Sequence, residues 1–358
     1  MSEDTPDLLS KARVIHEDTL CLDAHADIVT TKTSPQFLSK GGASKVAPEK
    51  MREGGLNSVV LALAVGPGSR SERGVKFARE QMQLQHATVL QLLEADKSIA
   101  LTKSAAEIEQ AFSEKRLSFI FGFQNARVLG KDPAYLDHYY QLGARVFALT
   151  HMGHNHFADS SRPNYNVKTC SYEVDEEHGG LSELGVKGIA KINRLGGVLD
   201  ISQLSYAATL QALSIAERPV IASHSNIKSI SNVKRNLRDD ELDKLAANGG
   251  VVHISAFHGN LLNFSDPDLI NNIKTARIEA DLPEAYDYPY ELYWEIKDKE
   301  VKKRYLTTIT ELLGPTKVHH LVDHIDYAVQ RLGVNHVGIG TDFNHGSGHI
   351  DGYVDAAD

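Results

Sequence analysis

His25 and Asp27 lie two residues apart in the stretch Leu22–Asp27, which reads LDAHAD. Side chains alternate faces along an extended strand, so residues two apart point in the same direction. An imidazole and a carboxylate that converge from one strand end are two of the three protein ligands that a catalytic metal needs. A buried histidine that pairs with a neighbouring aspartate for structural reasons is the alternative, and the rest of the chain has to distinguish the two.

The elements that must position this pair are short apolar runs separated by amphipathic helical patterns. We predict strands at Leu20–Val29, Ser58–Val65, Leu117–Phe123, Ala144–Thr150, Gly197–Ile201, Pro219–Ser223, Gly249–Ile254 and His336–Gly340. Helical patterns between them cover Glu72–Glu94, Leu136–Leu142, Gly185–Leu195, Ser205–Ser214 and Arg238–Ala247. Such alternation favours a (β/α)8 TIM barrel. A doubly wound open sheet ranks second, because no glycine-rich phosphate loop follows the first strand.

Polar or titratable side chains follow most of these predicted strands. In a barrel, functional residues stand at the carboxyl ends of the strands, where they meet at one mouth. The candidates in chain order are His25, Asp27, Gln124, His151, Gln203, His224 and Asp342. Each alone is compatible with a surface or capping role, but together they indicate a metal-assisted hydrolase site.

Length, charge and cysteine content narrow the classes of protein to consider. A chain of 358 residues is long enough for two domains, but α/β barrels of this length form one, so we predict a single domain over residues 1–358. The net charge of −9 argues against a main role in binding nucleic acid or an anionic membrane. The two cysteines, Cys21 and Cys170, imply no disulfide framework.

The sequence shows no targeting or membrane signal. The stretch Met1–Ser10 has neither the basic region nor the apolar core of a secretory signal. No apolar run approaches the roughly 18 residues of a membrane span. We therefore expect a cytoplasmic protein that does not span a membrane.

One predicted connection is much longer than the others. From about His258 to Thr316, after the seventh strand, the chain is acidic and rich in aromatic residues. This insertion either packs its aromatic side chains on the barrel rim or forms a lid or an oligomer contact over the site. Long insertions are often functional, so both interpretations stay open.

Longer motifs run through the chain from Leu20 to Gly346. In order they are LDAHAD, MREGGLNS (51–58), LGARVFALTHMGHN (142–155), HGGLSELG (178–185), NRLGGVLDIS (193–202), PVIASHSN (219–226), KRNLRDDEL (234–242) and HVGIGTDFNHG (336–346). Together they resemble the membrane (renal) dipeptidase family, the M19 metallopeptidases. The resemblance implies a (β/α)8 barrel, a two-zinc site, hydrolysis of dipeptides that often tolerates a D-residue at the second position, and a homodimer.

The resemblance also implies roles for individual metal ligands. His25 and Asp27 match ligands of the family's first metal, and His224 matches a ligand of the second. Asp342 matches the catalytic aspartate near the metal and is a further candidate ligand of the first metal.

Two further residues match substrate-binding positions of the family. His151 matches the histidine that contacts the substrate carbonyl or the tetrahedral oxyanion. Arg235 matches an arginine that binds the substrate carboxylate, a task that suits the guanidinium fork. The resemblance thus implies a metal-activated water, proton transfer by Asp342, oxyanion stabilisation by His151 and orientation of the substrate by Arg235.

Two positions depart from the family's pattern and bear on the metal count. Gln124 stands where the family has a bridging glutamate, and Gln203 stands where it has a second histidine of the second metal. A neutral amide binds zinc more weakly than carboxylate or imidazole and cannot bridge two cations with a shared negative charge. We therefore predict at most one tightly bound zinc, on His25 and Asp27 with Asp342 as a third ligand.

These observations predict a metal-dependent, dipeptidase-like hydrolase that cleaves a dipeptide or a related small amide with a free carboxylate. The alternative, favoured by the two glutamines, is a relative that has lost hydrolysis and binds or tailors a peptide-derived small molecule. Family members normally continue past the catalytic aspartate into a helix that closes the barrel. We expect this helix to be missing here, because only a short glycine- and aspartate-rich tail follows Asp342.

Overall fold

Parallel strands form the centre of the protein, as a computed structural model describes it for residues 5–166, 168–286, 288–345 and 350–358. The strands of the main sheet, in spatial order, are β1 (Leu22–Asp27), β2 (Ser58–Ala64), β4 (Leu117–Gln124), β5 (Ala144–Ala148), β8 (Val198–Asp200), β9 (Ile221–Ser225), β10 (Val251–Ile254) and β11 (Val337–Ile339). A short strand, β3 (Ile99–Leu101), pairs with the start of β4. All eight predicted strands are therefore confirmed, although Gly346 of the last motif and Met1–Asp4 lie outside the described residues.

The sheet closes through backbone contacts between β1 and the segment that follows β11. The amide of Asp27 donates to the carbonyl of Phe343 at 2.9 Å, and the amide of Asp342 donates to the carbonyl of His25 at 2.9 Å. The buried carboxylate of Asp23 strengthens this seam, because it accepts from both the amide and the hydroxyl of Thr341. The predicted (β/α)8 barrel is confirmed, and it closes where β1 meets the segment that follows β11.

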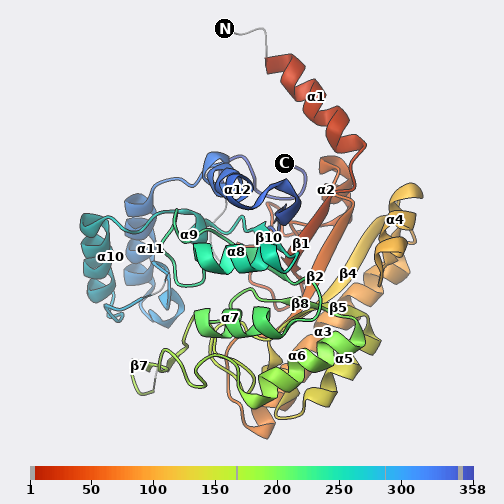
Figure 1. Cartoon of the computed structure of the whole chain (residues 1–358). Helices are drawn as coiled ribbons and strands as arrows, with labels where there is room; N and C mark the ends of the chain where they lie inside the picture. The colour runs from red at the N-terminus through yellow and green to blue at the C-terminus, as the bar shows by residue number, and fades with distance from the viewer. Residues whose placement is uncertain (1–4, 167, 287, 346–349) are drawn as a thin grey trace.

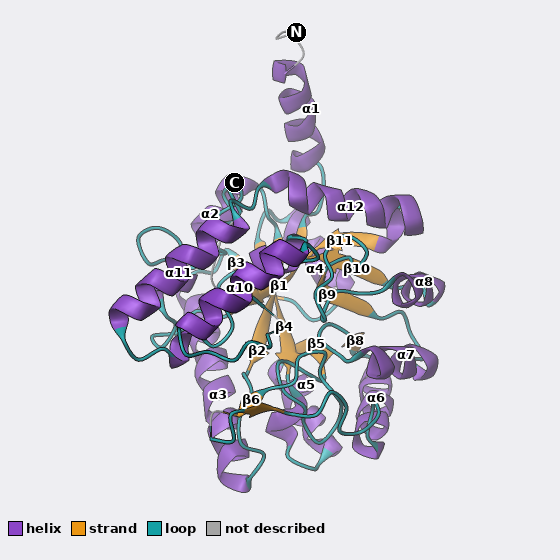
Figure 2. Ribbon diagram, turned by 90° about the vertical axis from the view of Figure 1, so that its left-hand side faces the viewer, coloured by secondary structure: helices purple, strands orange, loops and turns teal. Residues whose placement is uncertain are grey.

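Helices surround the strands, which lie at the centre in Figure 2. They are α1 (Thr5–Glu17), α2 (Pro48–Gly54), α3 (Glu72–Ala95), α4 (Ala105–Ser113), α5 (Leu136–Leu142), α6 (Glu183–Leu195), α7 (Tyr206–Ile215), α8 (Asp239–Ala247), α9 (His258–Leu261), α10 (Pro267–Glu279), α11 (Lys299–Leu313) and α12 (Val318–Leu332). Helix α1 extends away from the barrel (Figure 1). Among the described residues, no helix has both the length and the apolar character that a membrane span requires.

The five predicted helices are confirmed as α3, α5, α6, α7 and α8, with ends that differ by no more than two residues. Serine side chains begin three of them, because each accepts a hydrogen bond from an amide in the first turn of α3, α6 or α7. The predicted strand Pro219–Ser223 is shifted, since β9 runs from Ile221 to Ser225. Proline lacks an amide donor and is disfavoured within a ladder, so the strand begins after it and His224 lies inside it.

The insertion after β10 folds around a small apolar core of its own. Helices α10 and α11 lie side by side (Figure 2) and pack around buried residues such as Ile273, Tyr305 and Ile309. Its aromatic side chains therefore pack largely within the insertion itself rather than on the barrel rim, and a role as a lid or an oligomer contact stays a prediction. That this insertion and the barrel make one domain over residues 1–358, and that a closing C-terminal helix is missing, both stay predictions.

Candidate metal and substrate site

Three buried side chains from different strands converge at the carboxyl end of the barrel. His25 lies in β1, His224 lies in β9, and Asp342 follows β11. One potential ligand atom from each lies within 4.8 Å of the other two. The two imidazole rings stack, with their centroids 3.8 Å apart. Two imidazoles and one carboxylate at this spacing are a common donor set for a catalytic metal.

The hydroxyl of Ser223 determines which nitrogen of the His25 and His224 rings faces the candidate metal position. Ser223 Oγ donates its only proton to Asp200 Oδ2 at 2.5 Å. The same oxygen lies 2.7 Å from His224 Nδ1 and 3.4 Å from His25 Nδ1, so its two lone pairs accept from both rings. Both Nε2 atoms are then left with lone pairs, which is the form that binds a metal.

The lone pair of His25 Nε2 faces carboxylates rather than donors. His25 Nε2 lies 3.8 Å from Asp27 Oδ1 and 4.0 Å from Asp342 Oδ1. Within the described chain, Asp342 Oδ2 is buried without a hydrogen bond, although Arg235 Nη1 lies 3.8 Å away. Electron-rich atoms that face one another with no proton between them repel unless a cation lies among them. The residues present therefore fit a divalent metal.

Asp27 is oriented by a residue that the sequence interpretation missed. His345 Nδ1 lies 2.7 Å from Asp27 Oδ2. Burial raises the pKa of Asp27, but His345 and His25 outweigh it and hold the pKa below its ordinary value. Burial lowers the pKa of His345, but the Asp27 carboxylate outweighs it and raises the pKa. The contact therefore favours the charged form of both side chains, and Asp27 Oδ1 lies 3.8 Å from His25 Nε2.

Gln124 and Gln203 contact one another beside the triad. Gln124 Nε2 donates to Gln203 Oε1 at 3.2 Å and lies 3.4 Å from His224 Nε2. Because His224 Nε2 carries a lone pair, the Gln124 amide supplies the proton that it accepts. The two glutamines predicted to be degenerate ligands thus lie beside the second-metal histidine, joined to it by hydrogen bonds. The triad groups that histidine with His25 and Asp342, which the family resemblance implies as ligands of the other metal.

Two residues of this group hold an unusual backbone conformation. Gln203 has φ 66° and Asp342 has φ 60°, in the left-handed region that non-glycine residues rarely adopt. Such a conformation costs on the order of 1 kcal/mol and tends to occur at functional sites. Each lies three residues after the end of its strand, β8 for Gln203 and β11 for Asp342.

His151 and Arg235 border the triad, and both are buried. Burial lowers the pKa of His151 well below its ordinary value, so the ring is neutral at pH 7. Its Nδ1 atom has no hydrogen-bond partner among the described residues. Burial also lowers the pKa of Arg235, to about 10, against the opposing effect of Asp342. Arg235 Nη2 donates to the carbonyl of His224 at 2.6 Å, so this arginine contacts two of the three triad residues.

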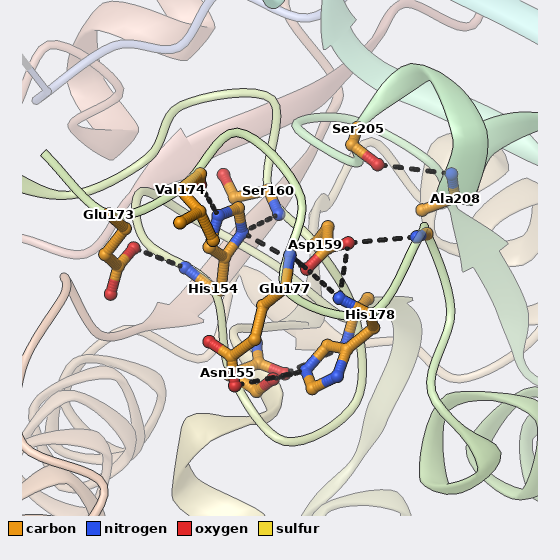
Figure 3. Close-up of polar contacts among 12 residues, drawn as sticks. His154, Asn155, Asp159, Ser160, Glu173, Val174, Glu177, His178, Ser205 and Ala208 are labelled. Atoms are coloured by element: carbon orange, nitrogen blue, oxygen red, sulfur yellow. Dashed lines mark hydrogen bonds and ion pairs between the residues drawn. The ribbon is translucent and has the colours of Figure 1, made fainter.

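The long loop between β5 and α6 carries His151 and is held by buried polar contacts (Figure 3). Asp159 is fully buried and accepts from three backbone amides in the segment 177–180. His154 Nδ1 accepts from the amide of Ser160 at 3.0 Å, and Ser160 Oγ donates to the carbonyl of His151 at 2.5 Å. The loop is therefore ordered by its own hydrogen bonds and presents His151 in a fixed position.

Comparison with known proteins identifies the family. A model of the membrane dipeptidase family, peptidase family M19, matches residues 9–358. The chain belongs to this family. It is 27% identical to dipeptidase verJ of Clonostachys rogersoniana over 246 residues, which cover 69% of this chain and 48% of that protein. It thus spans about half the length of the curated relatives that it matches.

Two solved structures of other proteins have the same fold. PvdM of Pseudomonas aeruginosa, described as a probable dipeptidase, is 27% identical with a TM-score of 0.83, over 99% of this chain and 90% of that one. A metallo peptidase of Rhodobacter sphaeroides, liganded with a phosphinate mimic of the dipeptide L-Ala-D-Ala, is 19% identical with a TM-score of 0.69, over 95% of this chain and 90% of that one. The M19 family is metal-dependent, and the buried triad is where this member has a candidate metal site.

Sequence reasoning missed several residues that shape the site. His345 lies three residues after Asp342 inside a recognised motif, so its polar character at a strand end was an available signal. Ser223 precedes His224 directly, and Asp200 ends β8. No local pattern predicts that Ser223 and Asp200 would meet, because their contact depends on the pairing of β8 with β9.

Proposed function

We propose that this M19 member is a metallodipeptidase that works with one divalent metal per chain, and that the metal is zinc. The observation that carries the proposal is the buried triad of His25, His224 and Asp342, with ligand atoms within 4.8 Å of one another. Asp27 supplies a further oxygen, 3.8 Å from His25 Nε2. A divalent cation held by these residues supplies a Lewis acid that polarises the scissile carbonyl and activates water.

Asp342 is the proposed proton carrier. Its two oxygens have different surroundings, since Oδ1 faces His25 Nε2 at 4.0 Å and Oδ2 faces Arg235 Nη1 at 3.8 Å. Oδ1 is suited to the metal, whereas the buried Oδ2 has no hydrogen bond within the described chain and is free to take a proton from water. The same oxygen then delivers the proton to the leaving amine.

His151 and Arg235 act on the substrate in this proposal. A neutral His151 donates a hydrogen bond to the oxyanion that develops on the scissile carbonyl, and its burial makes that bond stronger than in water. Arg235 adds positive charge at the same end of the site and attracts the free carboxylate of a dipeptide. The substrate class is a dipeptide or a related small amide with a free carboxylate, including one with a D-residue at the second position.

Release of D-alanine from Gly-D-Ala by the zinc-reconstituted protein tests this function. We expect turnover by the wild type and a loss of about 100- to 10,000-fold in Asp342→Asn, because the amide cannot carry the proton. Asp243→Asn is the matched control, since Asp243 is exposed and pairs with Arg331 on the surface. Equal turnover in Asp342→Asn and wild type would contradict the assigned role.

A second candidate is a relative that binds or tailors a peptide-derived small molecule without hydrolysing it. The hydrogen bonds of Gln124 to Gln203 and His224 favour it, because neutral amides lie where the family has second-metal ligands. Tight binding of a dipeptide mimic together with no release of D-alanine would select this candidate. We also propose a homodimer, as in the family, which light scattering of the purified protein tests.

A further inference from the structure

A row of aromatic and imidazole rings leads from the candidate site into the insertion after β10. The ring centroid of His151 lies 5.3 Å from that of His345, and His345 lies 6.3 Å from Phe257. Phe257 is 5.5 Å from Tyr288, and Tyr288 is 5.6 Å from Tyr290. Rings at such separations attract one another beyond the effect of the area that they bury. Each ring therefore restrains the position of the next.

At the site end of the row, His345 contacts the side chain of Asp27. The main chain of Asp27 is fixed independently, because its amide donates to the carbonyl of Phe343 and its carbonyl accepts from Asn344 Nδ2 at 2.8 Å. The carboxylate of Asp27 is instead held through Oδ2, which lies 2.7 Å from His345 Nδ1. The orientation of this carboxylate therefore depends on where the imidazole of His345 lies.

The imidazole of His345 depends in turn on its neighbours in the row. Its side chain is 31% exposed, and among the described residues its only side-chain hydrogen bond is the one to Asp27. Its aromatic neighbours are His151 and Phe257. The loop that carries His151 is ordered by its own hydrogen bonds. Phe257 is therefore the neighbour through which the insertion reaches His345.

The insertion fixes the far end of the row. Phe257, Tyr288 and Tyr290 all belong to its apolar core. Tyr290 Oη lies 2.9 Å from Thr310 Oγ1, a hydrogen bond that ties the row to α11. The ring of Tyr288 lies against the backbone of Gly259, because a Cβ at residue 259 would be 1.9 Å from Tyr288 Cε2. This close approach requires glycine, so the chain is built to admit the ring at that place.

We propose that Tyr288 and Phe257 are positioning residues that act through His345 to set the orientation of Asp27. The insertion after β10 thus determines how tightly the candidate site holds its metal, although it supplies no ligand. This inference rests on the proposed function, in which Asp27 provides an oxygen to the metal. It gives the insertion a role that is separate from that of a lid or an oligomer contact.

Zinc affinity, measured by competition with a coloured chelator, tests this inference without relying on catalysis. We expect His345→Ala to lose about 10- to 100-fold, as is typical when a residue that orients a metal ligand is removed. Tyr288→Leu should lose about 3- to 10-fold, because an apolar side chain remains but the ring contact is gone. Phe257→Leu interrupts the row at the next ring and should lose about as much. Tyr288→Phe keeps the ring and should stay within about twofold of the wild type.

A double variant distinguishes action through His345 from a general loosening of the insertion. In the His345→Ala background, Tyr288→Leu should change zinc affinity by less than about twofold, because its route to Asp27 is already interrupted. Ile273→Val is the matched control, since Ile273 is fully buried in the same core but is not part of the row. It should lower the unfolding temperature and leave the zinc affinity at the wild-type value. Circular dichroism confirms that each variant is folded.

Three results would overturn the inference. The first is wild-type zinc affinity in both Tyr288→Leu and Phe257→Leu. The second is a full further loss from Tyr288→Leu in the His345→Ala background, which would mean that the ring acts by another route. The third is a loss in Ile273→Val as large as that in Tyr288→Leu, which would mean that stability and not the row matters. In these cases the wild type still binds zinc and the proposed function survives, whereas a wild type that binds no zinc would overturn both.

Discussion

The Nδ1 atom of His224 lies 2.7 Å from the hydroxyl oxygen of Ser223. Since that hydroxyl donates to Asp200 at 2.5 Å, the imidazole must donate to it. The contact holds the ring in the tautomer whose Nε2 faces the triad. Groups that orient a metal-binding histidine in this way typically contribute about 10- to 100-fold to metal affinity.

Removing this contact should weaken metal binding without unfolding the barrel. We expect Ser223→Ala to lose about 10- to 100-fold in zinc affinity, because His224 is then free to adopt the other tautomer. A competition titration with a coloured chelator measures the change. Ser225→Ala is the matched control, since Ser225 lies in the same strand and contacts Ser202 rather than a histidine. Equal zinc affinity in Ser223→Ala and wild type would mean that the triad does not depend on this tautomer.

A second metal position should be recoverable by changing the two glutamines. Gln124 and Gln203 are 3.2 Å apart, and Gln124 lies 3.4 Å from His224 Nε2, so new ligands at these positions would meet that histidine. We expect the double change Gln124→Glu and Gln203→His to raise the zinc content from one to about two per chain and to increase dipeptide hydrolysis.

The single changes serve as controls for this restoration, and each should give less than the pair because a second cation needs both new ligands. Elemental analysis of the purified variants measures the zinc content. A folded double variant with no added zinc would show that the surrounding residues have been reshaped for neutral amides.

The strands and the first ligands were predictable from local pattern. Apolar runs between helical patterns located the eight strands of the barrel, and the alternation of side chains along LDAHAD predicted that His25 and Asp27 share one face. The role of Ser223 was not predictable in this way. Its contacts join residues far apart in the sequence, since Ser223 meets Asp200 of β8 and His25 of β1.

Other parts of the fold were not predicted from the sequence for a related reason. The short strand β3 was not predicted, because it depends on its pairing with β4. Only the fold reveals that most aromatic residues of the insertion form an apolar core of their own.

Acid should destabilise the protein through His324. This side chain is fully buried, accepts from the amide of Ile227 on Nδ1, and lies 3.2 Å from the carbonyl of Leu261 on Nε2. Burial lowers its pKa from 6.5 to about 4. The unfolded chain therefore takes up the proton first, so the stabilisation is complete above pH 6.5 and is lost as pH falls towards 4.

The loss due to His324 should reach about 2 kcal/mol of unfolding free energy between pH 7 and pH 5. Urea unfolding at the two pH values measures it, and His324→Gln should flatten the dependence because glutamine does not titrate. If His324→Gln has the same pH dependence as the wild type, another group is responsible for the acid sensitivity.

The central claim is that one metal per chain, held by His25, His224 and Asp342, is sufficient for dipeptide hydrolysis. Titrating metal-free protein with zinc while following the rate of Gly-D-Ala hydrolysis tests it most directly. We predict that the rate rises in proportion to added zinc and levels off at about one equivalent per chain. A rate that levels off only at about two equivalents, or no hydrolysis at any ratio, would contradict the claim.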